Sequence, residues 1–126
     1  MEKILVIGES PVEIDQLKKA AKELHIPLEQ VDFRLGYKEA HRYDYSQLKE
    51  NHIYSDVLVG PMPHKVRKCE GGSRGTSFIA MAEATPDVFP HIIRLMSGGA
   101  LKITRHSFQE GLKATFLYRK LTGATL

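Results

Sequence analysis

A short basic, glycine-rich stretch carries the densest chemistry in the sequence. Residues 71–77 read Gly-Gly-Ser-Arg-Gly-Thr-Ser and stand directly before a helix-like segment that begins at Phe78. Glycines let backbone amides approach an anion without interference from a Cβ atom, and the unpaired amides at a helix start favour negative charge. Arg74 can contact a phosphate or carboxylate through two N–H groups. We therefore expect the basic, glycine-rich loop 60–77, which ends in this stretch, to bind an anionic small molecule, with a nucleotide or another phosphorylated compound as the favoured ligand.

The residues expected to hold this ligand come from several places in the chain. Glycines and hydroxyl side chains would cradle the phosphate, and basic side chains would neutralise it. The segment from Arg34 to Tyr37 could meet a base or sugar, and the Glu9 carboxylate could accept hydrogen bonds from hydroxyl groups. The expected ligand-binding residues are Gly8, Glu9, Ser10, Arg34, Lys65, Gly71, Gly72, Arg74, Gly75, Thr76 and Ser77.

Known phosphate-binding motifs do not fit the stretch. A Walker loop would end in Gly-Lys-Ser/Thr, and a dinucleotide fingerprint would follow the first strand, where Gly8-Glu9-Ser10 lacks the spacing. Cys69 and Arg74 together resemble the nucleophile and arginine of the cysteine-dependent phosphatases. Those enzymes place five residues between the two, whereas this chain has four, and Glu70 adds a negative charge beside the thiol. The motifs therefore leave the identity of the ligand open.

Two histidines lie where a ligand is expected, so catalysis is a second hypothesis. Gly60-Pro-Met-Pro-His64 forms a turn that two prolines stiffen, and His106 follows a later apolar segment. A small transferase or hydrolase acting on a phosphorylated or glycosidic substrate would use His64 or His106 as acid and base, with Glu9 as the orienting group. A non-catalytic protein-interaction module is the third hypothesis. No cofactor is identified, and whether the protein is an enzyme stays open.

The histidines do not predict a metal site. None of the six forms a pair with ligand spacing and a nearby acidic or cysteine partner, so we expect no metal. They are His25, His41, His52, His64, His91 and His106.

Alternating apolar runs and helical stripes position these residues. Ile4–Ile7 and Asp56–Gly60 are apolar runs typical of strands buried on both faces, and Val31, Phe33 and Leu35 alternate with polar residues as in an edge strand. One helix is expected between Ser10 and Pro27, and it would begin with a capping box of Ser10 and Glu13. Another is expected from Phe78 to Ala84. A last helix would begin with a capping box at Ser107-Phe108-Gln109-Glu110 and end at Gly123. A short helix capped by Asp44 would carry Leu48.

The segment 91–104 allows two interpretations. A short helix starting at Pro90 could precede a strand at Leu101–Thr104, or a strand at Ile92–Met96 could enter a hairpin turn at Ser97-Gly98-Gly99. The first keeps strands and helices alternating and is favoured.

This order predicts a single α/β domain over residues 1–126. The fold class is a three-layer sandwich with a mainly parallel four- or five-stranded sheet, Rossmann-like or flavodoxin-like. Ligands of such folds bind beyond the carboxyl ends of the strands, and the glycine-rich stretch, Gly8–Ser10, Gly36 and Arg105–Ser107 would lie there.

Charge and composition limit the partners. Residues 1–60 contain 8 Lys and Arg against 11 Asp and Glu, whereas residues 61–126 contain 10 against 4, so the second half would face anions. The basic residues are scattered, so we do not expect nucleic acid. No apolar run reaches the length of a membrane helix, and the first run, which ends at Ile7, is shorter than the apolar core of a secretory signal. A single cysteine excludes an internal disulfide, so a cytoplasmic protein is expected. A homodimer could form through an edge strand or, as the favoured candidate, the C-terminal helix.

Overall fold

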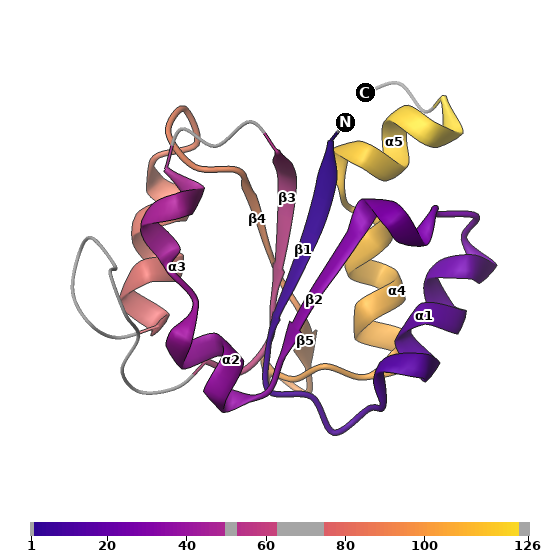
Figure 1. Ribbon diagram of the computed structural model, residues 1–126, viewed down its shortest axis with the longest axis horizontal. Helices are drawn as coiled ribbons and strands as arrows, with labels where there is room; N and C mark the ends of the chain where they lie inside the picture. The colour runs from indigo at the N-terminus through magenta and orange to yellow at the C-terminus, as the bar shows by residue number, and fades with distance from the viewer. Residues whose placement is uncertain (1, 50–52, 63–74, 124–126) are drawn as a thin grey trace.

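Four parallel strands form the centre of the molecule, and helices cover both of their faces (Figure 1). The computed structural model describes residues 2–49, 53–62 and 75–123. The strand order is β2-β1-β3-β4, and β5 and β6 make a separate antiparallel hairpin. The three-layer α/β fold predicted from the sequence is therefore confirmed. The elements are β1 (Lys3–Gly8), α1 (Ile14–Glu23), the 3₁₀ turn η1 (Leu28–Gln30), β2 (Val31–Leu35), α2 (Tyr37–Arg42), the 3₁₀ turn η2 (Tyr45–Leu48), β3 (Tyr54–Val59), α3 (Gly75–Ala84), β4 (His91–Arg94), β5 (Met96–Ser97), β6 (Ala100–Leu101), α4 (Arg105–Lys113) and α5 (Phe116–Thr122).

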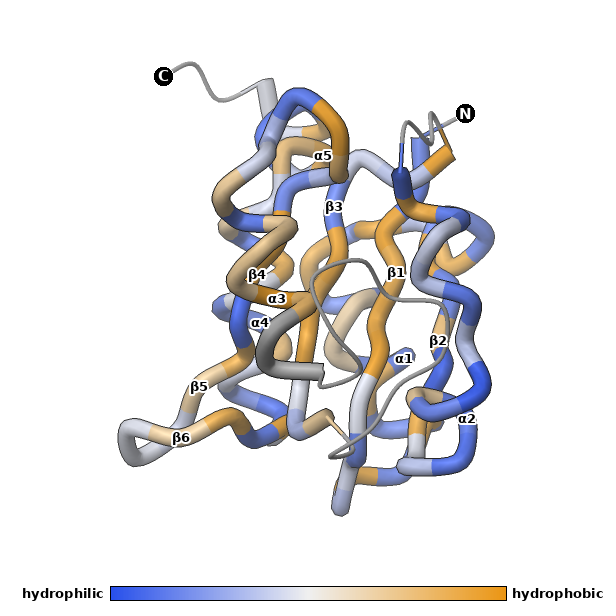
Figure 2. The backbone as a smooth tube through the Cα atoms, turned by 90° about the vertical axis from the view of Figure 1, so that its left-hand side faces the viewer, coloured by the Kyte–Doolittle hydropathy of each residue, from blue (hydrophilic) through white to orange (hydrophobic). Residues whose placement is uncertain are grey.

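The two faces of the sheet bury separate apolar clusters. Helices α1, α4 and α5 cover one face, and α2 and α3 cover the other (Figure 1). Ile4 and Val6 of β1 point to the first cluster, whereas Leu5 and Ile7 point to the second. All four side chains are fully buried, because a strand with helices on both sides has no face left for water. The apolar runs along β1 and β3 are continuous in Figure 2. The sequence predicted both strands from these runs.

The edge strand β2 and the 3₁₀ turn η2 also follow their sequence patterns. In β2, Val31, Phe33 and Leu35 face α1, and the residues between them are polar. Asp44 begins η2, and its carboxylate accepts from the amide of Ser46 at 3.1 Å. This capping bond is the one that the sequence predicts for the short helix that carries Leu48.

Helix α1 begins later than predicted. Its N-cap is Glu13, which makes no side-chain capping bond, and the helix starts at Ile14. The Ser10 hydroxyl instead donates to the carbonyl of Val12 at 2.8 Å and accepts from the Val12 amide at 3.1 Å. The capping box predicted for Ser10 and Glu13 is therefore wrong. Serine side chains compete for nearby backbone in this way, and residues 10–12 form a turn that leads the chain from the sheet to the α1 face.

The C-terminal segment forms two helices where one was predicted. Thr104 is the N-cap of α4, and it exchanges capping bonds of 2.9 Å with Ser107, so the capping box lies one turn earlier than expected. Thr115 caps α5 and accepts from the Tyr118 amide at 3.0 Å. A polar N-cap within the segment ends one helix and starts the next. Gly123 ends α5 as predicted, with a φ of 72°. Within the described ranges, no helix has the length and apolar character needed to cross a bilayer.

The favoured interpretation of segment 91–104 is also wrong. His91–Arg94 is the fourth parallel strand, and Met96–Ser97 pairs with Ala100–Leu101 in a hairpin that projects from the body of the molecule (Figure 2). Gly98 and Gly99 make its turn with φ values of 60° and 79°. Two consecutive glycines with positive φ are what a two-residue hairpin loop requires. The less favoured alternative, a strand and a hairpin turn at Ser97-Gly98-Gly99, gives the better account.

Candidate functional site

Three strand ends meet through backbone contacts at the carboxyl edge of the sheet, which lies at the bottom of Figure 1. The Gly36 amide donates to the carbonyl of Gly8 at 2.8 Å, and the Gly60 amide donates to the carbonyl of Ile7 at 2.9 Å. Gly8 has a φ of 135°, and a Cβ atom there would lie 2.9 Å from the backbone of Gly60. Only glycine allows β1 and β3 to approach so closely at this point.

The strand order makes this edge a topological switch point. The chain leaves β1 for α1 on one face and leaves β3 for α3 on the other face, so the two connections diverge between neighbouring strands (Figure 1). In open α/β sheets, ligands bind in the crevice that such a divergence leaves. The amide of Glu9 donates to the carbonyl of Pro61 at 2.9 Å, so the β1–α1 connection and the start of the segment after β3 lie side by side.

The Glu9 carboxylate binds the start of α2. Its Oε2 atom accepts from the Tyr37 amide at 3.2 Å, across the end of β2. A carboxylate at a helix start satisfies an amide that has no partner within the helix and interacts favourably with the helix dipole. Glu9 therefore fixes α2 to the end of β1, a role that the sequence did not predict.

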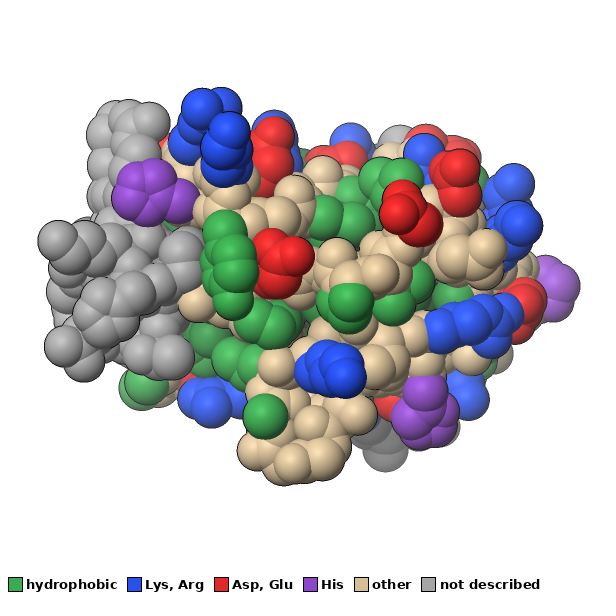
Figure 3. All heavy atoms as spheres, turned by 90° about the horizontal axis from the view of Figure 1, so that it is seen from below, with side chains coloured by type: hydrophobic (Ala, Val, Ile, Leu, Met, Phe, Trp, Pro, Cys, Tyr) green, Lys and Arg blue, Asp and Glu red, His purple; other side chains and the backbone are tan. Residues whose placement is uncertain are grey.

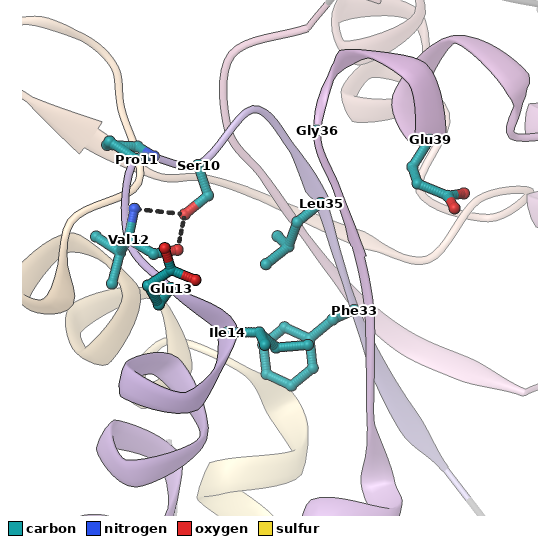
Figure 4. Close-up of a pocket in the computed structure, with 9 residues that line it drawn as sticks. All are labelled: Ser10, Pro11, Val12, Glu13, Ile14, Phe33, Leu35, Gly36 and Glu39. Carbon is teal, nitrogen blue, oxygen red and sulfur yellow. Dashed lines mark hydrogen bonds between the residues drawn. The ribbon is translucent and has the colours of Figure 1, made fainter.

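A cavity of about 420 Å³ lies beside the switch point, between the β1–α1 connection and the end of β2 (Figure 4). Leu35 projects into it, with Phe33 and Ile14 below. The Ser10 hydroxyl and the Glu13 carboxylate lie on the opposite, α1 side. The volume is in the range of pockets that hold small molecules, and the lining combines apolar side chains with a few polar groups, as such pockets do. Its full lining is Ser10, Pro11, Val12, Glu13, Ile14, Phe33, Leu35, Gly36 and Glu39.

Among the described residues that line this cavity there is no Lys or Arg, and two of them are glutamates. Glu13 faces the cavity, whereas the Glu39 carboxylate points away from it (Figure 4) and lies 3.7 Å from Arg34. Acidic and basic side chains are interspersed on this end of the molecule in Figure 3. The cavity itself therefore suits a neutral group with apolar surface and hydrogen-bond donors, such as a hydroxylated ring, better than a phosphate.

The structure brings part of the predicted ligand-binding set together. Gly8, Glu9 and Ser10 lie at the switch point, and Ser10 also lines the cavity. Because the Ser10 hydroxyl gives its proton to the carbonyl of Val12, it can offer a ligand only an acceptor. Arg34 lies on the α2 face of β2, opposite the face that carries Phe33 and Leu35, and does not line the cavity.

The glycine-rich stretch lies mostly outside the described residues. Gly75, Thr76 and Ser77 form the first turn of α3, and the helix predicted from Phe78 to Ala84 is confirmed within it. The predicted residues beyond the described ranges are His64, Lys65, Gly71, Gly72 and Arg74.

No hydrogen bond or ion pair joins the side chains of His106 and Glu9, two described residues that the catalytic hypothesis pairs. The His106 side chain is 84% exposed in the first turn of α4, and its ring lies 3.9 Å from Glu110 in the next turn. Arg105, His106 and Ser107 form the first turn of α4 and follow the β5–β6 hairpin, so the strand predicted to precede them at Leu101–Thr104 is wrong. Ser107 is buried, and its hydroxyl donates to the carbonyl of Lys102 at 2.8 Å. Among the described residues, no cluster of three or more potential metal ligands forms.

The amino edge of the sheet contains a buried carboxylate that sequence reasoning missed. Asp56 is fully buried at the start of the apolar part of β3. Its two oxygens accept from His91 Nδ1 at 2.9 Å, from the Ser55 hydroxyl at 2.6 Å and from the amides of Phe116 and Leu117 at 2.9 and 3.3 Å. Asp56 therefore caps α5 from a strand. An acidic residue at the head of an otherwise apolar strand was the only sequence signal for it.

A second carboxylate bridges strands at the same edge. Asp32 accepts from the Tyr54 hydroxyl at 2.6 Å and lies 3.5 Å from the Lys3 ammonium. The pKa of Tyr54 is raised far above its ordinary value, chiefly by burial of the side chain and next by the hydrogen bond to Asp32. Burial also raises the pKa of Tyr43, against a smaller lowering by Arg34. These shifts stabilise neutral phenols within the fold and do not produce a group that titrates near neutral pH.

Comparison with known proteins adds no relative to this description. No protein-family model matches the sequence, and no curated protein or solved structure is significantly similar to it. The function must therefore be argued from the residues themselves.

Proposed function

We propose that the protein binds a nucleotide or a similar phosphorylated small molecule at the carboxyl edge of the sheet. The hydroxylated or ring portion would occupy the cavity between Ser10 and Leu35. The phosphate would face the basic glycine-rich segment and the first turn of α3. The observation that carries this proposal is the bond between the Glu9 amide and the Pro61 carbonyl, because it holds the β1–α1 connection, whose Ser10 lines the cavity, beside the start of the basic loop 60–77.

The two parts of such a ligand need different chemistry, and the two parts of the site differ in the same way. The cavity offers the apolar side chains of Phe33 and Leu35 together with acceptors on Glu13 and Ser10, which suit a ring and its hydroxyl groups. The basic loop 60–77 offers Lys65 and Arg74 in sequence, and it runs into the start of α3, where amides favour an anion. The assignment of the phosphate to this segment rests on sequence, because residues 63–74 lie outside the described ranges.

The experiment is thermal unfolding of the protein, at fixed salt, with nucleoside monophosphates, nucleosides, dinucleotides, sugar phosphates and inorganic phosphate. A compound present at about 100 times its dissociation constant adds about 2.7 kcal/mol to the stability of the folded state, which gives a readily measured rise in Tm. We expect a nucleotide to raise Tm more than its nucleoside or phosphate alone. No rise with any of these compounds would contradict the proposal and favour a protein partner.

Two variants assign the parts of the site. Arg74→Ala should weaken nucleotide binding and leave any nucleoside binding unchanged, whereas Glu13→Gln should weaken both. Glu110→Gln is a matched control, because it changes the same charge on an exposed side chain of α4. An affinity for the confirmed ligand that is unchanged in Arg74→Ala would remove the glycine-rich segment from the site.

A further inference from the structure

The outer side of β2 is an open sheet edge. Among the described strands, β2 is the last on its side of the sheet, and only β1 pairs with it. The amide of Gly36 points to β1, so those of Asp32 and Arg34 do as well, since backbone direction alternates along a strand. The N–H and C=O groups of Phe33 and Leu35 then point outward. Among the described residues, no backbone group pairs with them; Val31 alone has an outward partner, the carbonyl of Leu28.

The surface beside this edge is hollowed and partly apolar. A groove of about 590 Å³ follows the strand, and Ile14 at its rim is 39% exposed. Residues from both faces of β2 line the groove, which means that the strand edge itself is accessible. An exposed edge with apolar neighbours is a template for pairing with another strand. The groove is lined by Ile14, Lys18, Leu28, Glu29, Val31, Asp32, Phe33 and Arg34.

The sequence of β2 is complementary to itself in the antiparallel direction. If two copies pair about a two-fold axis at Phe33, each Asp32 stands opposite the partner's Arg34, and each Val31 stands opposite the partner's Leu35. The charged pairs lie on one face of the combined sheet and the apolar pairs on the other. Opposite charges directly across an antiparallel pair stabilise it, and like charges destabilise it.

The backbone groups fit the same register. The two Phe33 residues would exchange both of their outward hydrogen bonds, as directly opposed residues do at alternate positions of an antiparallel ladder. Each Leu35 amide would donate to the carbonyl of the partner's Val31, whose own amide already bonds within its chain to Leu28. No backbone hydrogen bond in this register needs an N–H or C=O group that is already bonded among the described residues.

We propose that β2 is the dimerisation edge of this protein, and that a second copy pairs with it antiparallel about Phe33 to form one eight-stranded sheet. A foreign peptide would have no need for the charge order of β2 to complement itself. The dimer would also bring the partner's Val31 beside Leu35, at the open side of the cavity. The proposal does not depend on which ligand the cavity binds. It replaces the C-terminal helix, favoured from the sequence, as the contact surface.

Charge reversal on β2 tests this arrangement. Arg34→Asp places like charges in both cross-strand pairs and should weaken dimerisation about tenfold or more, as measured by sedimentation equilibrium across the micromolar range. Arg42→Asp makes the same charge change on the exposed last turn of α2, off the strand, and should leave the dimer intact. A wild-type protein that stays monomeric, or equal effects of the two variants, would overturn the proposal.

Mixing two reversed variants tests the register itself. Arg34→Asp and Asp32→Arg should each be largely monomeric alone, and their mixture should form a heterodimer, because every cross-strand pair then joins opposite charges. Circular dichroism establishes that each variant is folded before mixing. Asp32→Arg could fail to fold because it loses the contacts of Asp32 with Tyr54 and Lys3. The comparison of Arg34→Asp with Arg42→Asp would then still show whether β2 is the dimer contact surface. Two folded variants that stay monomeric when mixed would exclude this register.

Discussion

The carboxyl and amino edges of the sheet, where the strands end and begin, are built in opposite ways. At the carboxyl edge, Gly8, Gly36 and Gly60 bring strand ends together through backbone contacts, and a cavity remains beside them. At the amino edge, the carboxylates of Asp56 and Asp32 join strands and a helix through side chains, and Asp56 is fully buried.

This difference separates a place for a ligand from a place for stability. The Asp56 carboxylate receives four donors, so it has little capacity left for anything else, and its burial without them would be costly. At the carboxyl edge, by contrast, the Ser10 hydroxyl and the Glu13 carboxylate border an open cavity. A cluster of charged residues is therefore not in itself a functional site in this fold, and the less conspicuous glycine edge is the better candidate.

The largest expected effect is that of Asp56→Ala. It leaves His91 and the amides of Phe116 and Leu117 without their acceptor, and we expect a loss of about 3 kcal/mol or more in the free energy of unfolding. Urea denaturation measures it. Asp87→Ala, on an exposed turn, should stay within about 0.5 kcal/mol of the wild type. A loss below about 1 kcal/mol for Asp56→Ala would show that this edge is not held by its carboxylate.

Gly8→Ala should destabilise the protein at the carboxyl edge of the sheet. Its Cβ atom would lie 2.9 Å from the backbone of Gly60, and its φ of 135° is unfavourable for alanine, so we expect a loss of about 3 kcal/mol. Gly99→Ala is the control, because its φ is also positive while its Cβ would meet open space. That change should cost only about 1 kcal/mol, from strain alone. Equal losses in thermal unfolding would argue against a close approach of β1 and β3.

Glu9→Gln should have a smaller effect. The amide oxygen can still accept from Tyr37, but the negative charge at the start of α2 is lost, so we expect a loss of about 0.5–1 kcal/mol. Urea denaturation at low salt measures this, and added salt should reduce the difference. Glu39→Gln, within the same helix and paired loosely with Arg34, should cost less. The reverse order would contradict the capping role of Glu9.

The smallest expected effect appears at alkaline pH. The pKa of Tyr54 is raised in the folded protein, so above about pH 10 the unfolded chain loses this proton while the folded chain keeps it. The contribution of Tyr54 to stability is therefore fully present below pH 10 and declines as the pH rises further. Tyr54→Phe should make the alkaline decline of Tm shallower. An unchanged decline would mean that other groups, such as Tyr43, account for it.

The central architecture could be predicted because local pattern and tertiary role agree there. Ile4–Ile7 is apolar on every residue, which is required of a strand covered on both faces, and Gly123 ends a helix through its own backbone preference. The edge position of β2 followed from the polar residues between Val31, Phe33 and Leu35. In these segments a short stretch of sequence contains the whole physical reason for the structure.

The errors occurred where a partner distant in sequence decides the outcome. Ser10 looks like a helix cap, yet it bonds to Val12 in a turn, and Asp56 caps α5 from sixty residues away. The cavity joins Glu13 and Phe33, which no motif connects. The hairpin after β4 is the less favoured interpretation of the sequence because it interrupts the alternation of strands and helices, although Gly98 and Gly99 already indicate a two-residue turn.

The most direct test of the proposed site compares the two edges in a single titration. Amide chemical shifts of ¹⁵N-labelled protein would be followed with the compound that raises Tm most. We predict that the amides of Gly8, Glu9, Ser10 and Gly36 shift, and that those of Asp56, His91 and Phe116 do not. Shifts confined to the amino edge, or no shifts with any compound of the panel, would contradict a ligand site at the carboxyl edge.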